Sequence, residues 1–585
     1  MIDLEVLNRC SLPDFVAALD GVFEHSPWVA ERSAGRRPFA TRFALLDALC
    51  ATLFEAPREA QLALVRAHPE LAGSAARRGE LTAASSAEQA GAGLTQAPAD
   101  ALVELQALNA AYRERFGFPF VISVKGRHSA DILAELRRRL ANETEAELRT
   151  ALAEIARIAD FRLAERCAVE DLAAAGREIL AMAEALARYS EREDALCCTY
   201  LSAAHQATAR RLRDWMLQAG LDAHIDEVGN VVGRWASAAP GAKTLITGSH
   251  YDTVTDAGRY DGRLGILLPI VVAGLLRRRG VALPFDLEII GFAEEEGVRF
   301  KSAFLGSSAV AGCFDPALLQ RTDAAGITLA EALRAAGCDP ARIPALARDP
   351  ARLLGYVEVH IEQGPVLLTE NLALGVVTAI AGSRRFRVSV HGRAGHAGTV
   401  PMHLRRDAAA GAAEIVLAVE RRCSGTPGLV GTVGRLEVPD GAVNVVPGRC
   451  ELSLDIRAPS DATRDAAVEA VLAEIAAIAA RRGLRIEHEE ILRAEATPCA
   501  PALQRRLDAA IRAVTGAAHS RHLPSGAGHD AMMMARLTEV GMLFVRCGAG
   551  GISHHPEESL SAEDAALAAA AFAQLLQDDA PWSPA

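Results

Sequence analysis

The chain has 585 residues, of which 50% are hydrophobic and only 5% aromatic, and its formal net charge is −12. At about 100–200 residues per domain, this length predicts three or four domains, each large enough to bury a core. An acidic chain with few aromatic side chains lacks the basic face that nucleic acid binding needs, so we expect no nucleic acid partner.

The cysteines and the apolar runs bear on compartment and membrane association. The 11 Cys residues are scattered without a paired framework, which predicts reduced thiols in a cytoplasmic protein. The opening MIDLEVLNRC lacks the apolar core of a signal peptide. The longest apolar run, 265–276, is too short to span a bilayer and predicts a buried helix. We therefore expect no membrane partner.

The apolar pattern of residues 1–166 predicts an all-α domain. Apolar side chains recur at a spacing of three and four, as in Phe15, Leu19 and Val22. One irregular, apolar stretch, FGFPFVISVKGR at 116–127, interrupts the helical pattern because its Gly and Pro break a helix. An Ala-rich helical stretch at 166–200 then carries the domain boundary, without a Pro, Gly or Ser linker.

The pattern changes after residue 225, where short β-rich runs alternate with helices. The runs at 244–247, 285–292 and 356–361 are typical of a mainly parallel α/β sheet. The polar clusters SHYDTV, EEEG and HIEQG follow or interrupt them, and sites in open α/β sheets form at the carboxyl ends of strands. We assign this α/β domain to 175–379 and, after an insertion, to 493–580.

The insertion at 380–492 has a different pattern of apolar and polar residues. Its segments 385–392 and 451–459 alternate apolar and polar residues, as strands do when only one face is buried. Helical stretches at 405–422 and 460–483 accompany them. The sequence thus predicts a small inserted α+β domain.

Five side chains of the α/β domain are candidate metal ligands at strand ends: His250, Asp261, Glu296, His360 and His554. Imidazole and carboxylate groups suit Zn²⁺, and carboxylates also suit Mn²⁺. Asp261 lies in a Gly-flanked loop and is the natural bridge between two cations, which make water a nucleophile at neutral pH.

Two neighbouring carboxylates complete this candidate site. Glu295 lies beside the ligand Glu296 and can take a proton from water and pass it to a leaving nitrogen. Asp252 follows His250 by two residues and can orient its imidazole. A lone His is usually structural, and three consecutive Glu usually form a solvated face. The prediction of a metal site therefore depends on these residues occurring together in ordered motifs.

The motifs SHYDTV, YDG, EEEG, HIEQGP and SHHPEE occur in this order over some 400 residues. This part of the chain resembles the binuclear metallohydrolases that include allantoate amidohydrolase, N-carbamoyl-L-amino-acid hydrolase and β-ureidopropionase. The resemblance implies two divalent cations per chain, Zn²⁺ or Mn²⁺, held by the five ligands above, with Glu295 as the base. His554 is chosen over His555 because it directly follows a Ser.

The same resemblance implies substrate contacts at Gln363 and, in the inserted domain, at His396, Asn444 and Arg457. A guanidinium can grip a carboxylate with two hydrogen bonds, and an imidazole can donate to a developing oxyanion. In relatives the inserted domain, with a ferredoxin-like fold, acts as a lid, dimerises and lends such residues to the neighbouring subunit. A homodimer is therefore implied.

Taken singly, the N-terminal candidate residues are explained by structural roles, since His68 lies near a helix end and Glu88 on a helix. The ordered set HPELAG, SxxEQ, AGL, NAAYRERFGFPFVISVKGR and a late RL nevertheless resembles 2-oxo-4-hydroxy-4-carboxy-5-ureidoimidazoline (OHCU) decarboxylase over nearly all of residues 1–165. Glu70 departs from the Asp that relatives commonly carry.

The decarboxylase resemblance implies loss of CO₂ to give (S)-allantoin without a cofactor, because the substrate's own ring system delocalises the carbanion. His68 and Glu88 would be the acid/base pair, and Arg162 would bind substrate oxygens. The remaining implied contacts are Pro69, Ser85, Gln89, Phe118 and Ile122.

Together the halves predict a bifunctional enzyme of purine-ring breakdown: a decarboxylase, and a metal-dependent hydrolase that converts allantoate to ureidoglycine, ammonia and CO₂. Small-molecule ureides are the expected partners. A first alternative makes the C-terminal half an N-carbamoyl-L-amino-acid or ureidoglycolate hydrolase. A second makes one half a non-catalytic assembly or binding module, against which the complete sets of site residues argue.

Overall fold

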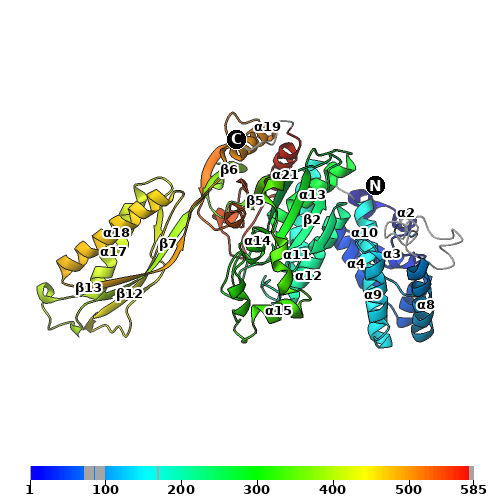
Figure 1. Cartoon of the computed structure of the whole chain (residues 1–585), viewed down its shortest axis with the longest axis horizontal. Coiled ribbons are helices and arrows are strands. Elements are labelled where there is room, and N and C mark those ends of the chain that lie inside the picture. The colour runs from blue at the N-terminus through cyan, green and yellow to red at the C-terminus, as the bar shows by residue number, and fades with distance from the viewer. Residues whose placement is uncertain (1, 72–84, 86–87, 89–98, 168–169, 579–585) are drawn as a thin grey trace.

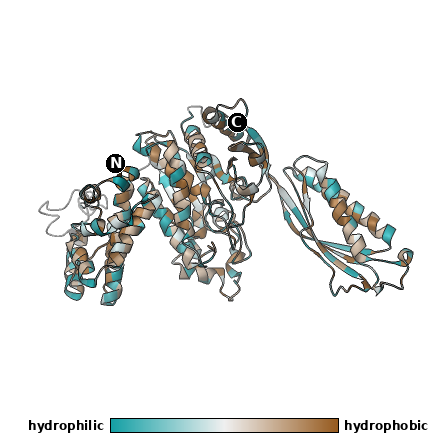
Figure 2. Cartoon of the chain, turned by 180° about the vertical axis from the view of Figure 1, so that it is seen from behind, coloured by the Kyte–Doolittle hydropathy of each residue, from teal (hydrophilic) through white to brown (hydrophobic). Residues whose placement is uncertain are grey.

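The computed structural model describes residues 2–71, 85, 88, 99–167 and 170–578. Figure 1 shows three bodies in a row: a helical N-terminal body, a central body built on a large sheet, and an inserted domain at the far end. In Figure 2 hydrophobic residues run along the helices and strands of the central body. The N-terminal body and the inserted domain each have a hydrophobic core of their own, although Phe43 and Phe161 of the N-terminal body pack into the core of the central body.

The elements described in the N-terminal body are helices. Side-chain caps start several of them, as where the Thr41 hydroxyl accepts the Ala44 N–H. The longest helix has 23 residues and packs against two other helices of this body. The helices are α1 (Leu4–Arg9), α2 (Leu12–Ala18), α3 (Trp28–Ser33), α4 (Arg42–Phe54), α5 (Arg58–Ala67), α8 (Ala99–Phe116), α9 (Ser129–Arg139) and α10 (Thr144–Arg166).

The expected irregular stretch lies between α8 and α9 and is buried. Phe118 and Phe120 are each 1% exposed, and both rings pack against Tyr112 of α8, with centroids 6.0 and 5.3 Å away. Aromatic packing therefore holds a segment without regular hydrogen bonding in the core.

The central body has a nine-stranded mixed sheet of order β1-β2-β4-β3-β5-β16-β6-β14, with β15 beside β6. Its centre, β4-β3-β5-β16, is parallel, whereas β1, β2, β6 and β14 join their path neighbours antiparallel. The strands are β1 (Asp222–Ile225), β2 (Val231–Trp235), β3 (Thr244–His250), β4 (Asp286–Phe292), β5 (Leu353–Ile361), β6 (Leu374–Ile380), β14 (Thr497–Pro498), β15 (Arg521–Ser525) and β16 (Val540–Val545).

Helices cover this sheet, and the predicted apolar helix is among them. Every residue of α13 from Leu264 to Leu276 is buried, because the helix connects β3 to β4, packs against the sheet and contacts three further helices. The helices of the central body are α11 (Leu172–Ala187), α12 (Ala203–Gln218), α13 (Leu264–Arg278), α14 (Leu305–Val310), α15 (Leu329–Ala335), α16 (Val366–Thr369), α19 (Pro501–Thr515), α20 (Ala531–Met534) and α21 (Ala562–Leu576).

The inserted domain is a sheet of order β10-β12-β7-β13, with β9 beside β12, covered on one face by two helices. All its pairings are antiparallel, and a helix follows both β7 and β12, which is the βαββαβ arrangement. Its elements are β7 (Gly382–His391), α17 (Ala408–Ser424), β9 (Val430–Thr432), β10 (Leu436–Glu437), β12 (Arg449–Ala458), α18 (Asp461–Arg482), β13 (Arg485–Ala494) and the ribbon β8 (Gly395–His396) with β11 (Val445–Val446).

The N-terminal body docks on the central body through a contact of rings and charges. The ring of Phe43 on α4 lies 5.5 Å from that of Trp215 on α12. Arg157 on α10 donates two hydrogen bonds of 2.8 Å to Asp214 on α12. Asp160, 2% exposed, accepts from three partners across or beside the contact: Arg42, Arg211 and Gln218.

Among the described residues, no helix combines the length and the apolar character that a membrane span requires. The 11 cysteines are free thiols.

Candidate functional site

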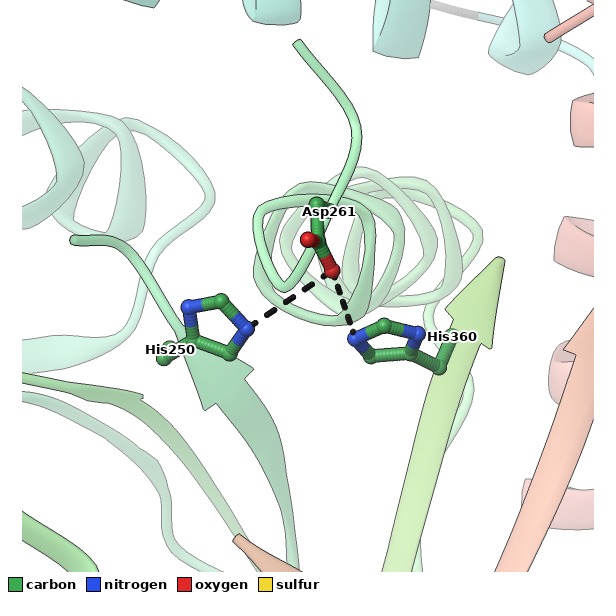
Figure 3. A group of neighbouring side chains, drawn as sticks. All are labelled: His250, Asp261 and His360. Atoms are coloured by element: carbon green, nitrogen blue, oxygen red, sulfur yellow. Dashed lines mark ion pairs between the residues drawn. The ribbon is translucent and has the colours of Figure 1, made fainter. Parts of the chain in front are cut away.

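Three predicted ligands meet at the carboxyl ends of β3 and β5. His250 ends β3, His360 lies near the end of β5, and Asp261 comes from the loop before α13 (Figure 3). One oxygen of Asp261, Oδ1, lies 3.8 Å from Nε2 of His250 and 3.3 Å from Nε2 of His360. The three side chains are buried. They converge because the parallel strands β3 and β5 are neighbours and end at the same edge.

The other two predicted ligands gather around the second oxygen of Asp261. Nε2 of His554 lies 3.0 Å from Oδ2 of Asp261 and 3.4 Å from Oε1 of Glu296. The sets His250–Asp261–His360 and Asp261–Glu296–His554 each place one ligand atom per residue within 4.8 Å of the others. The donor set therefore fits two divalent cations that share Asp261.

The charges of the cluster agree with a cation site. Burial opposes ionisation of Asp261, but hydrogen bonds from His360 and His554 outweigh it and hold the pKa of Asp261 well below its usual range. The bond to Asp261 raises the pKa of His554 to about 9. Burial raises the pKa of Glu296 to about 7. Crowded carboxylates of this kind need positive charge, which two cations would supply.

Glu295 and Asp252 lie beside the predicted ligands. The carboxylate of Asp252 accepts the backbone N–H groups of Glu295 and Glu296, at 3.0 and 3.1 Å, and lies 3.5 Å from Nδ1 of His250. One carboxylate thus orients both a ligand ring and the EEEG turn. Burial raises the pKa of Glu295 well above its ordinary value, and Glu296 adds to the rise.

The predicted contacts with substrate are divided between two places. Gln363 donates from Nε2 to Oδ1 of Asp261 at 3.0 Å, so it holds the shared carboxylate. Arg457 on β12 bonds Asp455 and the Gly526 carbonyl, and lines a groove of about 480 Å³ that the inserted domain forms with Gly526 of the central body. His396 and Asn444 are exposed and adjoin on the β8–β11 ribbon, where the Ala397 N–H donates to the Asn444 carbonyl.

The structure also gathers the N-terminal candidates around one small cavity. Its lining includes His68, Pro69, Ser85, Glu88, Ile122 and Arg162. Phe118 was expected in its wall, but its ring packs in the aromatic core, and Phe120 lines the cavity instead. Gln89 lies outside the described residues.

His68 is held in a defined protonation state. Its Nδ1 lies 3.0 Å from the Leu64 carbonyl, so Nδ1 carries the hydrogen and Nε2 is left as an acceptor. Nε2 is buried and has no hydrogen-bond partner among the described residues. Burial lowers the pKa of His68 to about 4. The cavity therefore contains a neutral imidazole with a free lone pair.

Two buried carboxylates were missed by sequence reasoning. Glu558 accepts the N–H groups of Tyr260 and Asp261, at 2.8 and 3.2 Å, and so fixes the loop of the shared ligand. It belongs to the motif SHHPEE, which was the signal available. Glu24 accepts from Arg162 at 2.7 Å across 138 residues of sequence, and no motif marks it.

Comparison with known proteins confirms the family resemblance of both the N-terminal and the C-terminal part of the chain. Residues 8–164 match the family model of OHCU decarboxylase, and residues 246–578 match that of peptidase family M20/M25/M40. An allantoate deiminase of Arabidopsis thaliana is 39% identical over 68% of this chain and 82% of its own length. An N-carbamoyl-L-amino acid amidohydrolase of Geobacillus stearothermophilus is 39% identical over 62% and 89%.

A solved structure extends the likeness to the fold. The hydantoinase/carbamoylase family amidase of Burkholderia multivorans has a TM-score of 0.64 and 31% identity, over 68% of this chain and 97% of that one. The chain therefore belongs to peptidase family M20/M25/M40 over its C-terminal part and carries an OHCU decarboxylase domain before it.

Proposed function

We propose that the chain is a bifunctional enzyme of purine catabolism: its N-terminal half (1–166) decarboxylates OHCU to (S)-allantoin, and its C-terminal half (175–580) hydrolyses allantoate. Two family matches and the allantoate deiminase relatives support the pairing. The product of the first reaction, once its ring is opened by a separate hydrolase, is the substrate of the second. That shared chemistry favours allantoate over other carbamoyl compounds.

The hydrolase half would act through the residues gathered around Asp261, together with Arg457 of the inserted domain. Two divalent cations, Zn²⁺ or Mn²⁺, would polarise the substrate carbonyl and lower the pKa of water when bound by the five ligands. Glu295 would take the proton from water and deliver it to the leaving nitrogen. Asp252 and Gln363 would hold His250 and Asp261 in place. Arg457 would bind the substrate carboxylate.

One observation supports the proposed metal-dependent hydrolysis best: the two carboxylate oxygens of Asp261 face two different pairs of candidate ligands. The test is ammonia release by Zn²⁺- or Mn²⁺-loaded protein from allantoate. We expect Glu295→Gln to lower kcat at least about 10³-fold while both cations stay bound. Glu193→Gln, an exposed site in the same half, is the control. Unchanged turnover in Glu295→Gln would refute the role of Glu295 as the general base.

An N-carbamoyl-L-amino acid is the second candidate substrate, because that relative is as identical to this chain as the allantoate deiminase is. Both compounds carry a carboxylate and a ureido group. Rates with the two compounds, measured on the same preparation, separate the candidates. A higher kcat/KM for the carbamoyl amino acid would keep the metal chemistry and remove allantoate as the substrate.

The inserted domain (380–492) is proposed to pair two chains and to lend His396 and Asn444 to the partner's site. These exposed side chains lie on the ribbon β8–β11, and no hydrogen bond described links them to the metal ligands of their own chain. We expect mixed Glu295→Gln and His396→Ala chains to regain activity, because one site of each mixed dimer then has both residues intact. No recovery after subunit exchange would place His396 in its own chain's site.

In the decarboxylase half, the neutral His68 and Glu88 would act as the acid/base pair without a cofactor, and Arg162 would bind the substrate's oxygens. Pro69, Ser85, Gln89, Ile122 and the backbone around Phe118 would complete the site. The test is formation of (S)-allantoin followed by circular dichroism. We expect His68→Asn to lower kcat about 10²- to 10⁴-fold while allantoate hydrolysis by the same chain is unchanged.

A further inference from the structure

Arg162 is fully engaged by its surroundings. Its five N–H donors all reach acceptors in the described chain. Nε and Nη2 donate to Glu88 at 2.8 and 3.0 Å, and Nη2 also reaches the Ser85 hydroxyl at 3.2 Å. Nη1 donates to the Gly21 carbonyl at 2.9 Å and to Glu24 at 2.7 Å. The guanidinium thus has two edges, each held by a different carboxylate.

The two carboxylates differ in their access to the cavity. The side chain of Glu24 is 2% exposed and that of Glu88 is 28% exposed. Glu88 lines the cavity, whereas Glu24 lies behind the guanidinium, in the loop between α2 and α3. Glu24 also accepts the Ser85 hydroxyl at 3.3 Å, so one oxygen joins two residues of the cavity wall.

From this arrangement we infer that Glu24 is a positioning residue for decarboxylation: it fixes the inner edge of Arg162 so that the outer edge faces the substrate. The inference rests on the proposed decarboxylase function and adds a residue to it. Glu24 would act through Arg162 and Ser85, without touching the substrate itself.

The need for such a residue follows from competition at the outer edge. Substrate oxygens that bind Nε and Nη2 take the place of Glu88, which frees Glu88 for proton transfer. If Glu88 alone held the guanidinium, its departure would leave a long side chain free to rotate at the moment of reaction. Glu24, buried and bonded to Nη1, keeps the guanidinium plane fixed while the outer partner changes, and supplies the buried counterion that Arg162 requires.

The test is Glu24→Gln in the full chain, with both activities measured on one preparation. The amide keeps the size of the side chain but removes its charge. We expect kcat for decarboxylation to fall about 10- to 100-fold, with KM changed less than about threefold. The reason is that the neutral amide holds the inner edge of Arg162 less firmly, while the charge that Arg162 presents to the substrate is unchanged. Allantoate hydrolysis reports the amount of folded chain. Glu55→Gln, at an exposed pair with Arg36 in the same body, is the matched control.

Equal kcat in Glu24→Gln and the wild type would overturn the inference, as would a loss that hydrolysis shares in proportion. Crystal structures of the two proteins give a readout that does not depend on the reaction. We expect the Arg162 guanidinium of the variant to leave the Gly21 carbonyl. If it keeps its place, Glu24 does not position it. A wild type that does not decarboxylate OHCU would instead refute the proposed function, and the structures would still decide the role of Glu24.

Discussion

At the scale of single residues, burial sets the chemistry that His68 can perform. Its Nδ1–H is committed to the Leu64 carbonyl, and its pKa is lowered from 6.5 to about 4 because the charged ring would be desolvated. The neutral ring therefore persists through the range in which a solvated histidine titrates. Its free lone pair lies in the cavity that Glu88 and Arg162 also line, which suits the role of base that we propose for it.

This predicts the pH dependence of decarboxylation. The active form is neutral, and protonation begins only as the pH falls toward about 4, so kcat/KM should stay flat from about pH 7.5 to 5.5. The profile of kcat/KM at 25 °C measures it, with far-UV circular dichroism at each pH as the check that the chain stays folded. An acid limb with its midpoint near 6.5 that His68→Asn removes would contradict the buried neutral state.

At the scale of elements, close packing of helices explains one small residue. Gly176 lies in α11 where it crosses α21, and a methyl group there would come 1.9 Å from the Ala562 carbonyl oxygen. The first helix of the central body is thus held directly against its last, which is why the stretch after residue 170 belongs with the hydrolase.

Gly176→Ala reverses the usual sign of a helix substitution. Alanine is worth about 1 kcal/mol over glycine inside a helix, but the clash with backbone outweighs this, and we expect a loss of about 1–3 kcal/mol. Thermal unfolding of the metal-loaded chain measures it. Gly425→Ala, where the added methyl meets no atom within 4 Å, should change stability by less than about 0.5 kcal/mol. A stabilised Gly176→Ala would show that α11 and α21 are not in contact.

At the scale of the whole molecule, one helix serves both halves. α10 presents Arg157 and Asp160 to the hydrolase, and Arg162 and Ile158 to the cavity of the decarboxylase. We therefore expect docking of the two bodies to affect the geometry of the N-terminal site. Phe43 and Phe161 also belong to the hydrophobic core that runs through the central body.

Asp160→Asn tests this coupling. It removes the carboxylate shared by Arg42 and Arg211 and leaves buried positive charge, which costs about 3–5 kcal/mol. We expect a lower unfolding temperature and slower decarboxylation, with hydrolysis kept below the transition. Asp47→Asn breaks the exposed pair with Arg188 at the same contact and should cost less than about 1 kcal/mol. Equal effects of the two variants would mean that the halves are only tethered.

The sequence by itself determined the chemistry and most of the elements. The alternation of β-rich and helical stretches indicated β3, β4, β5 and the buried helix α13, because periodicity is a local property of the chain. The ordered motifs indicated the five candidate ligands, since ligand type depends only on side-chain identity. The alternation of apolar and polar residues also indicated the inserted domain, with strands and helices close to their predicted ranges.

Only the tertiary structure decided how these groups act on one another. It showed which oxygen of Asp261 faces which pair of ligands, and that the edges of the sheet are antiparallel. It placed Glu24 behind Arg162 and Phe118 in the core. Such contacts join residues far apart in the chain, and they follow from the packing of whole elements. A carboxylate in a loop carries no local sign of the buried cation that it will meet.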